Sequence, residues 1–256
     1  MAGNLAKILA QKQSELESLR LRTLPAPPAR REVSLSRASN AGRLSLISEI
    51  KRRSPSAGKL STVLSVAERA RAYERGGASM LSVLCDSHFF DGDYQHLQQA
   101  REAVKLPLLC KEFVIDEVQL DVARAYGADA VLLIVRCLTP QRTRELVAAT
   151  RARKLVPFVE VATEDELQIA LDAGSDLIGV NARDLDTLVM DAERAARVLA
   201  AIPDTVVRAH LSGLSKPEDI ARLRQSSADA ALIGEALMRA DDPEPLLLSL
   251  TAAARA

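Results

Sequence analysis

The sequence predicts an α/β fold in which strands and helices alternate and close into a single (β/α)8 barrel, preceded by a helical arm. Two observations predict this fold. From Leu46 onward, short apolar runs alternate without interruption with amphipathic helical stretches, and strict alternation of this kind requires a parallel sheet. The apolar runs number eight, and eight strand–helix units in about this chain length form a barrel most naturally.

The predicted elements follow one another with a recurrent joint between them. The strands are predicted at residues 46–50, 80–84, 106–109, 130–135, 155–159, 177–180, 205–209 and 230–233. Helical patterns include residues 67–75, 117–126, 142–153, 164–173 and 218–224. Glycine, a common helix stop, is followed by small polar residues at 76–79, 127–129 and 174–176, with 227–229 as a glycine-free echo.

A doubly wound open sheet is the alternative to the barrel. Such a sheet usually has a Gly-rich dinucleotide-binding turn after its first strand. Here the first strand is followed by Ser54-Pro55-Ser56-Ala57-Gly58. The sequence therefore favours the barrel.

The chain divides into a helical arm with its linker, residues 1–43, and the barrel, residues 44–256. Prolines at positions 25, 27 and 28 mark the end of the helical part of the arm. Apolar residues recur there at helical spacing and form one stripe, at Leu5, Ile8, Leu9, Leu16 and Leu19. This stripe must lie against another surface, which is either the chain's own barrel or another subunit.

Composition restricts the class of protein. The 256 residues are 48% apolar and carry 34 basic and 34 acidic side chains, with no charge asymmetry that would indicate nucleic acid or a membrane surface. The amino terminus lacks the apolar core of a signal peptide, and no run is long enough to span a bilayer. We therefore expect a cytoplasmic enzyme or binding protein, monomeric or homodimeric.

The three cysteines indicate neither a disulfide framework nor a metal site. Cys85, Cys110 and Cys137 are odd in number, far apart, and lie in or beside apolar runs. This pattern is typical of buried reduced thiols, so no metal is expected.

Polar residues stand where the predicted strands end, and active sites of this fold, the TIM barrel, lie at the carboxyl ends of the strands. In strand order these residues are Glu49 and Lys51, Lys111, Arg136, Glu160, Asn181 with Arg183, Ser212 with Gly213, and Gly234 with Glu235. The sequence therefore predicts that they face one site.

Two lysines at strand ends indicate proton transfer. Side chains alternate across a strand, so Glu49 and Lys51 share a face, as either a structural salt bridge or a catalytic pair. Lysine is scarce, occurring only at positions 7, 12, 51, 59, 105, 111, 154 and 216. Arginine cannot release a proton near neutrality, whereas a desolvated or crowded lysine can.

Glycines after the seventh and eighth strands indicate a phosphate site. Gly213 and Gly234 lie in the two loops with which barrel enzymes often bind a substrate phosphate. Turn formation is the other explanation of a glycine at a strand end.

The sequence resembles the indole glycerol phosphate synthase family along essentially its whole length, including a helical amino-terminal arm. The motifs that carry the resemblance are Ser48-Glu49-Ile50-Lys51-Arg52-Arg53-Ser54-Pro55-Ser56-Ala57-Gly58, Phe89-Phe90-Asp91-Gly92, Leu109-Cys110-Lys111-Glu112-Phe113, Ala128-Asp129-Ala130-Val131-Leu132-Leu133-Ile134, Val159-Glu160-Val161, Ile178-Gly179-Val180-Asn181-Ala182-Arg183-Asp184-Leu185 and Leu232-Ile233-Gly234-Glu235-Ala236-Leu237-Met238.

The resemblance implies a cofactor-independent ring closure. The substrate would be anthranilate joined to a phosphorylated deoxyribulose, and closure would release carbon dioxide and water. Lys111 would be the main general acid and Glu160 would act in the later dehydration. Lys51 would pair with a substrate anion and Glu49 would tune it, while the lysine that serves each proton step stays open. Partners would be the phosphorylated substrate and other enzymes of tryptophan biosynthesis.

The resemblance also implies which residues bind the substrate. Asn181 and Arg183 would position a hydroxyl and the anthranilate end, and Phe90 and Phe113 would pack against the aromatic ring. The sugar-phosphate side would be lined by Ser54, Ser212, Gly213, Leu232, Gly234 and Glu235. Structural explanations exist for several of these residues: plain core for the phenylalanines, a turn cap for Asn181, a local ion pair for Arg183 with Asp184, and a rim salt bridge for Arg136.

Four positions depart from the family pattern. Leu211 stands where a glutamate is expected before the Ser-Gly of strand seven, Cys85 where threonine is usual, Glu112 where aspartate follows the lysine, and Asp93 where serine is usual. By strand alternation His210 points to the opposite face and cannot replace the missing carboxylate. Three hypotheses therefore stand: a working synthase, a diverged enzyme acting on a related anthranilate- or indole-derived phosphate, and a catalytically weak barrel that binds a ligand or partner.

Overall fold

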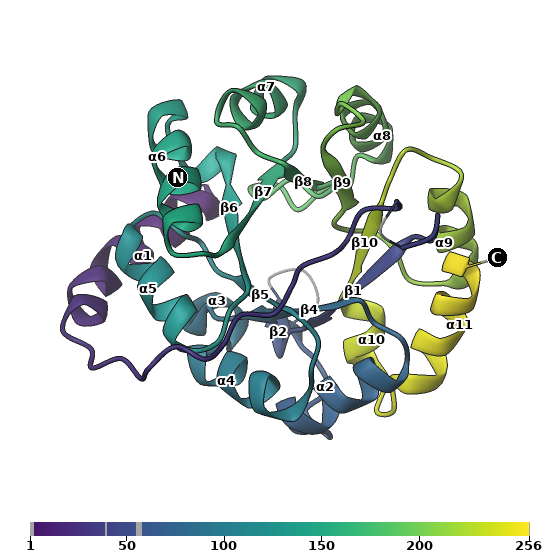
Figure 1. Cartoon of the computed structure of the whole chain (residues 1–256), viewed down its shortest axis with the longest axis horizontal. Coiled ribbons are helices and arrows are strands. Elements are labelled where there is room, and N and C mark those ends of the chain that lie inside the picture. Colours follow the sequence, from purple (N-terminus) through teal and green to yellow (C-terminus); the bar gives the residue numbers. More distant parts are fainter. Residues whose placement is uncertain (1–2, 39, 55–57, 256) are drawn as a thin grey trace.

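The computed structural model describes residues 3–38, 40–54 and 58–255 and shows a closed barrel of eight parallel strands (Figure 1). The strands are β1 (Ser45–Ile50), β4 (Met80–Leu84), β5 (Leu108–Lys111), β6 (Ala130–Ile134), β7 (Val156–Val161), β8 (Leu177–Val180), β9 (Val207–His210) and β10 (Ala230–Ile233). They pair in chain order, and β1 closes the ring by pairing with both β4 and β10. The predicted TIM barrel is confirmed.

Helices form a ring outside the strands (Figure 1). They are α2 (Val66–Arg75), α4 (Tyr94–Ala103), α5 (Glu117–Ala125), α6 (Pro140–Ala152), α7 (Glu164–Asp172), α8 (Ala192–Ala201), α9 (Pro217–Arg224) and α11 (Glu244–Arg255), with short helices α3 (Ser87–Phe90) and α10 (Glu235–Arg239) and a 3-10 turn η1 (Val135–Cys137). A small antiparallel ribbon, β2 (Arg53–Ser54) with β3 (Gly58–Lys59), follows β1. Within the segment from Ser54 to Gly58 that follows the first strand, positions 55–57 lie outside the described residues.

Two strands begin two residues later than the sequence predicts. The third was predicted to begin at residue 106, but β5 begins at Leu108, because Pro107 has no N–H to donate and disturbs the residue before it. The seventh was predicted to begin at residue 205, but β9 begins at Val207, because Val206 N–H closes a turn onto the carbonyl of Pro203 at 3.1 Å.

Successive strand residues alternate between two apolar cores. In β1, Leu46 packs in the large core between the sheet and the helices, whereas Ile47 packs inside the barrel. Phe158 of β7 is fully buried in the same interior core. Because both faces of each strand are covered, the strands appear in the sequence as nearly continuous apolar runs.

The arm contacts both ends of its own barrel. Helix α1 (Asn4–Arg20) lies beside α5 (Figure 1), and its Leu5 and Ile8 join the interior core. The linker then crosses the amino-terminal end of the barrel, where Arg31 N–H donates to Asp129 and Leu35 is buried in the interior core. The apolar stripe of the arm therefore covers the chain's own barrel.

The start of α1 is held by the loop that follows β8. Gly3, at the N-cap position, has no side chain to accept from the first turn. Asp186 supplies the acceptor instead, since its Oδ1 receives the N–H of Leu5 at 3.0 Å and its carbonyl receives the side-chain amide of Asn4 at 3.0 Å. A carboxylate at a helix N-terminus is stabilising.

Among the described residues, no helix has the length and apolar character needed to cross a membrane.

Candidate active site

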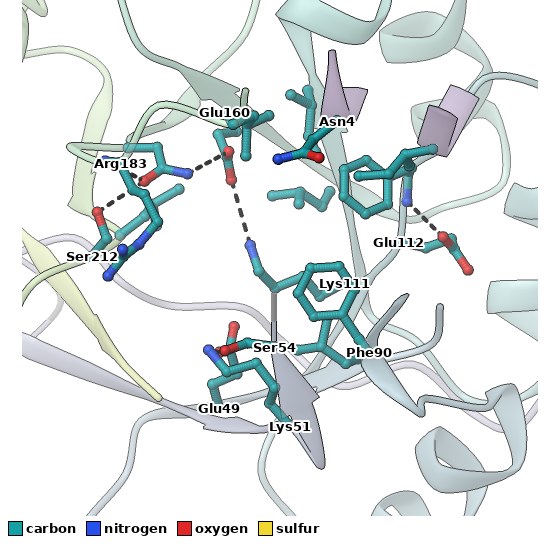
Figure 2. Close-up of a pocket in the computed structure, with 18 of the residues that line it drawn as sticks. Asn4, Glu49, Lys51, Ser54, Phe90, Lys111, Glu112, Glu160, Arg183 and Ser212 are labelled. Carbon is teal, nitrogen blue, oxygen red and sulfur yellow. Dashed lines mark hydrogen bonds and ion pairs between the residues drawn. The ribbon is translucent and has the colours of Figure 1, made fainter. Parts of the chain in front are cut away.

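The predicted site residues line two adjoining cavities at the carboxyl ends of the strands. The first, about 150 Å³, holds most of the charged groups (Figure 2). The second, about 440 Å³, lies against the loops after β9 and β10, and its volume falls in the range of about 300–1,000 Å³ typical of ligand pockets. Five residues line both cavities, namely Glu49, Lys51, Arg183, Leu211 and Ser212.

The pair on β1 faces both cavities, as strand alternation predicts. Lys51 Nζ lies 2.7 Å from Glu49 Oε1, with Glu49 2% and Lys51 16% exposed. Burial opposes the charge of Glu49, but Lys51 and Lys111 outweigh it and hold the pKa of Glu49 below its ordinary value. An added Cβ at Gly234 would collide with the Glu49 carboxylate, so this glycine gives the carboxylate its space.

A chain of polar contacts runs across the first cavity from β5 to the loop after β9 (Figure 2). Lys111, the last residue of β5, places its Nζ 3.4 Å from Glu160 Oε2 on β7. The other Glu160 oxygen accepts from the amide of Asn181 at 2.9 Å. Asn181 Oδ1 in turn accepts from Ser212 Oγ at 2.8 Å. These bonds fix the orientation of Glu160 and leave the lysine amine directed into the cavity.

Asn181 both caps a turn and lines the cavity. Its Oδ1 also accepts the backbone N–H of Arg183 at 2.9 Å, so the turn-cap explanation from the sequence is correct and compatible with a place in the site. The guanidinium of Arg183 donates to the carbonyl of Leu188 at 3.1 Å, and Arg183 lines both cavities.

Two phenylalanines form an aromatic wall on the side of the first cavity opposite the Asn181 loop. The rings of Phe90, at the end of α3, and Phe113, two residues after β5, lie 6.0 Å apart at an interplanar angle of 36°. Both residues line the cavity. Phe113 is buried and Phe90 is half-buried. Offset rings of this kind leave an apolar surface on which a planar group could pack.

The second cavity is lined by glycines and small side chains of the loops after β9 and β10, together with larger apolar and charged side chains. Gly213 has a φ of +84°, a conformation that side-chain-bearing residues rarely adopt. Leu232 of β10 and Gly234, directly after that strand, also line it. Glu235 also lines it, and its carboxylate pairs with Arg239 at 2.9 Å, so this arginine is placed beside the cavity as well. Ser54, predicted for the sugar-phosphate side, lines the first cavity rather than the second.

Leu211 lies between the cavities and its side chain faces the barrel interior. It is 6% exposed, belongs to the interior core and lines both cavities. An added Cβ at Gly179 would come within 2.6 Å of Leu211 Cδ1, so Gly179 makes room for it. His210 is absent from the described lining of either cavity, and its Nε2 lies 2.7 Å from the carbonyl oxygen of Ser212. The predicted divergence of the two side chains is observed.

Arg136 forms a rim salt bridge rather than part of the central site. It pairs with Glu166 at 2.8 Å and Asp184 at 2.6 Å. The alternative of a local ion pair between Arg183 and Asp184 is therefore wrong, because Asp184 is engaged by Arg136. Hydrogen bonds from backbone N–H groups, chiefly that of Thr187, together with Arg136, lower the pKa of Asp184 to about 2.

The sequence did not reveal the part of the arm that reaches the site. Asn4 and Ile8 of α1 line the first cavity together with Leu185 and Leu188 of the loop that holds α1. The apolar stripe showed that α1 packs on a surface but not on which one.

The three cysteines are free thiols, with Cys85 and Cys110 buried and Cys137 half-buried, and the described residues contain no cluster of potential metal ligands.

Comparison with known proteins now identifies the family. The sequence profile of "Indole-3-glycerol phosphate synthase" matches residues 3–250. The chain belongs to the indole-3-glycerol phosphate synthase family. An indole-3-glycerol phosphate synthase from Exiguobacterium sp. is 42% identical over 246 residues, covering 96% of this chain and 95% of the relative. Indole-3-glycerol phosphate synthase 2 of Streptomyces coelicolor is 43% identical over 252 residues, covering 95% and 96%.

Solved structures agree with the fold. Thiamine phosphate pyrophosphorylase from Pyrococcus furiosus superposes with a TM-score of 0.63 at 17% identity, covering 83% of this chain and 96% of that one. A 3-hexulose-6-phosphate synthase gives the same TM-score and identity, covering 82% and 99%. At this identity the likeness concerns the barrel alone. Membership of the indole-3-glycerol phosphate synthase family makes the chain an enzyme, a decarboxylating lyase of tryptophan biosynthesis.

Proposed function

We propose that the chain converts 1-(2-carboxyphenylamino)-1-deoxyribulose 5-phosphate to indole-3-glycerol phosphate with Lys111 as the main general acid. The observation that carries this assignment is the convergence of Lys51, Lys111 and Glu160 on one cavity between an aromatic wall and a glycine-lined second cavity. Burying three ionisable side chains at one end of a barrel costs several kcal/mol unless they pair closely, and a core gains nothing from them.

Ring closure requires an acid beside the ketone. The ring carbon that bears the carboxylate attacks the ketone carbon, and Lys111 gives a proton to the ketone oxygen as the new carbon–carbon bond forms. Carbon dioxide then leaves, and the electrons of the broken bond return to the ring. Lys111 suits the role because its side chain is 20% exposed and, among the described residues, its amine forms an ion pair with one carboxylate, that of Glu160.

Dehydration requires a second proton delivery. The hydroxyl made from the ketone oxygen leaves as water after it receives a proton from Lys51 or Lys111, and Glu160 accepts the proton that the neighbouring carbon, bonded to nitrogen, loses as the ring double bond forms. Glu160 is 3% exposed and its orientation is fixed by Asn181. A residue that moves protons along a defined path needs such a fixed orientation. Lys51, held by Glu49, also pairs with a substrate anion.

The two cavities divide the substrate between them. The anthranilate ring packs on Phe90 and Phe113 in the first cavity, with Arg183 and Asn181 at its polar edge. The phosphate lies in the second cavity against Ser212, Gly213, Leu232, Gly234 and Glu235, which are joined by Arg239 as a cation that the sequence did not reveal. Ser54 lines the first cavity, so its contact is to the sugar portion.

The test is turnover of the carboxyphenylamino-deoxyribulose phosphate, followed by the fluorescence of the indole product. We expect turnover in the parent protein and a loss of about 10²–10⁴-fold in kcat for Lys111→Ala, the range typical of a general acid. Lys105→Ala, which removes an exposed lysine distant from the cavities, is the matched control and should retain activity. Equal activity in the two variants would contradict the role of Lys111.

Leu211 supports a second candidate, a diverged enzyme acting on a related anthranilate- or indole-derived phosphate. An aliphatic side chain that faces both cavities makes their junction apolar, so an altered substrate would differ at the atoms that lie there. Leu211→Glu restores the family's carboxylate. Activity that appears only in this variant, with the parent active on another member of a substrate panel, would favour the second candidate.

We also propose a cytoplasmic location, a monomeric or homodimeric state, and the division into arm 1–43 and barrel 44–256. The burial of the α1 stripe on its own barrel supports a monomer, since that apolar surface needs no second subunit. Light scattering of the purified chain measures the mass, and a dimer would show that another face associates.

A further inference from the structure

A buried lysine of the arm lies beside the segment that carries Lys111 but does not line the first cavity. Lys12 of α1 is 1% exposed, and its Nζ lies 2.6 Å from Asp86, 3.1 Å from Glu112 and 2.9 Å from Glu15. Asp86 and Glu112 are themselves 0% and 3% exposed. Lys12, Asp86 and Glu112 form a cluster, the Lys12 clamp, that the reaction described above does not use.

Each buried carboxylate of the clamp also holds backbone at the edge of the first cavity. Glu112 directly follows Lys111, and its Oε1 accepts the N–H of Phe113 at 2.7 Å. Asp86 caps α3 through Oδ1, which accepts the N–H groups of Phe89 at 2.6 Å and Phe90 at 3.1 Å. The clamp therefore touches both segments that present the aromatic wall, and one of them presents the general acid.

The sheet does not hold these two segments together. In the described part of the chain, the bond from Cys85 N–H to the carbonyl of Lys111, at 3.0 Å, is the last backbone hydrogen bond between the β4 and β5 sides of the mouth. Beyond it both segments leave the barrel. Lys12 is the only cation of the described residues that forms an ion pair with both Asp86 and Glu112.

Stability alone does not account for such a cluster. Apolar side chains of similar volume often stabilise a fold as well as a buried ion pair or better, because the ions lose their hydration. Ion pairs and hydrogen bonds differ from apolar contacts in being directional, and they therefore fix where particular atoms lie. The atoms fixed here belong to segments that carry proposed site residues.

We propose that Lys12 is a positioning residue for ring closure: by binding Asp86 and Glu112 at once, it fixes the segments that place Lys111 and the rings of Phe90 and Phe113 against the substrate. The inference rests on the proposed function. It gives the arm a part in the chemistry, since the lysine that orders the mouth comes from α1 and not from the barrel.

A double-mutant cycle tests the proposal. Lys12→Met keeps the length of the side chain and removes the charge, and it is compared in the parent and in the Lys111→Ala protein at a temperature where all of the variants are folded by circular dichroism. We expect kcat of the parent to fall about 10²-fold, the cost of misplacing a reacting group by about 1 Å. In the Lys111→Ala background the general acid is already absent, so we expect the same change to cost less than in the parent, by well over the roughly twofold deviation from additivity that independent sites show.

Arg101→Met is the matched control, because Arg101 and Asp129 form a buried ion pair, 2.7 Å apart, near the amino-terminal end of the barrel. It should lower the melting temperature without lowering kcat. If Lys12→Met does not fold, Asp86→Asn breaks the contact to Lys12 while its remaining oxygen still caps α3, and it should lower kcat in the same background-dependent way.

Equal losses of turnover in the two backgrounds, or a loss in Arg101→Met as large as that in Lys12→Met, would overturn the positioning role. Parent-like kcat in a folded Lys12→Met or Asp86→Asn protein would also overturn it, and would leave the proposed function intact. Absence of turnover in the parent would overturn the proposed function, and the inference with it, before any variant is compared.

Discussion

Two lysine–carboxylate clusters lie at the same end of this barrel and differ in how their cations are used. In the cavity, Lys51 and Lys111 are 16% and 20% exposed, and each pairs with one carboxylate of the described residues. Lys12 is 1% exposed and pairs with both carboxylates of the clamp, Asp86 and Glu112, and also with Glu15, which is 26% exposed. The carboxylates behind the cavity lysines are as buried as those of the clamp, so the difference lies in the amines.

An amine that faces a cavity with one partner can meet a substrate, whereas an amine surrounded by carboxylates cannot. Burial opposes the charge on Lys12, but Glu112 and Asp86 outweigh it and raise the pKa of Lys12 above its ordinary value. Such a lysine keeps its proton and acts as a fixed point. Lysine therefore takes part in proton transfer in one cluster and holds backbone segments in position in the other, and its surroundings decide which.

The largest effect should come from disturbing the cavity cluster. Glu160→Gln removes the charge beside Lys111 and retains the shape of the side chain. We expect kcat to fall about 10²-fold or more, as for loss of a group that moves protons, with little change in melting temperature. Steady-state kinetics and thermal unfolding measure the two. A variant that loses stability but keeps kcat would place Glu160 with the clamp rather than with the chemistry.

The clamp should instead affect how the free energy of unfolding depends on pH. Burial, with a contribution from Asp86 and against the opposing effect of Lys12, raises the pKa of Glu112 from 4.5 to about 7. Between these values the folded protein holds a proton that the unfolded chain has released, so the free energy of unfolding falls as pH rises, by up to about 1.4 kcal/mol per pH unit. Below about 4.5 and above about 7 this contribution is constant.

Glu112→Gln removes that titration. Denaturant unfolding at pH values from 4.5 to 8 gives the free energy of unfolding for both proteins. Their difference isolates this group because the other carboxyl groups are common to both. We expect the variant to gain stability relative to the parent as pH rises to about 7 and the difference then to level off. Parallel curves would show that Glu112 does not change its protonation on folding in this range.

The cavity cluster could be predicted from the sequence, and the clamp could not. Glu49, Lys51, Lys111 and Glu160 stand at the ends of strands that apolar runs define, and barrel topology brings all strand ends to one edge. The contacts of Lys12 join α1 to Asp86 and Glu112, which lie far along the chain, and no local pattern specifies such pairings. The sequence held one indication that Lys12 is buried, since it lies midway between Ile8 and Leu16 within the apolar stripe.

Other features beyond prediction depend on local turns or on tertiary contacts. The strand starts near Pro107 and Val206 followed local turn chemistry rather than apolar pattern. Asp184 was free, by sequence, to pair with its neighbour Arg183, but it pairs with Arg136 from the loop after β6. Periodicity therefore determined which residues share the barrel mouth, and tertiary contacts determined which of them touch.

The smallest effect should come from the other attachment of α1. Asp186 is exposed, and its carboxylate accepts the first-turn N–H of Leu5. Asp186→Ala should cost about 1 kcal/mol of stability, the usual loss for a removed cap, and raise KM modestly because Asn4 and Ile8 line the cavity. Asp186→Asn keeps an acceptor oxygen and is the matched control. If Asp186→Ala lowered kcat as strongly as Lys12→Met, the whole of α1 and not the buried lysine would order the mouth; a change confined to KM and stability would show that the clamp alone sets the position of the general acid.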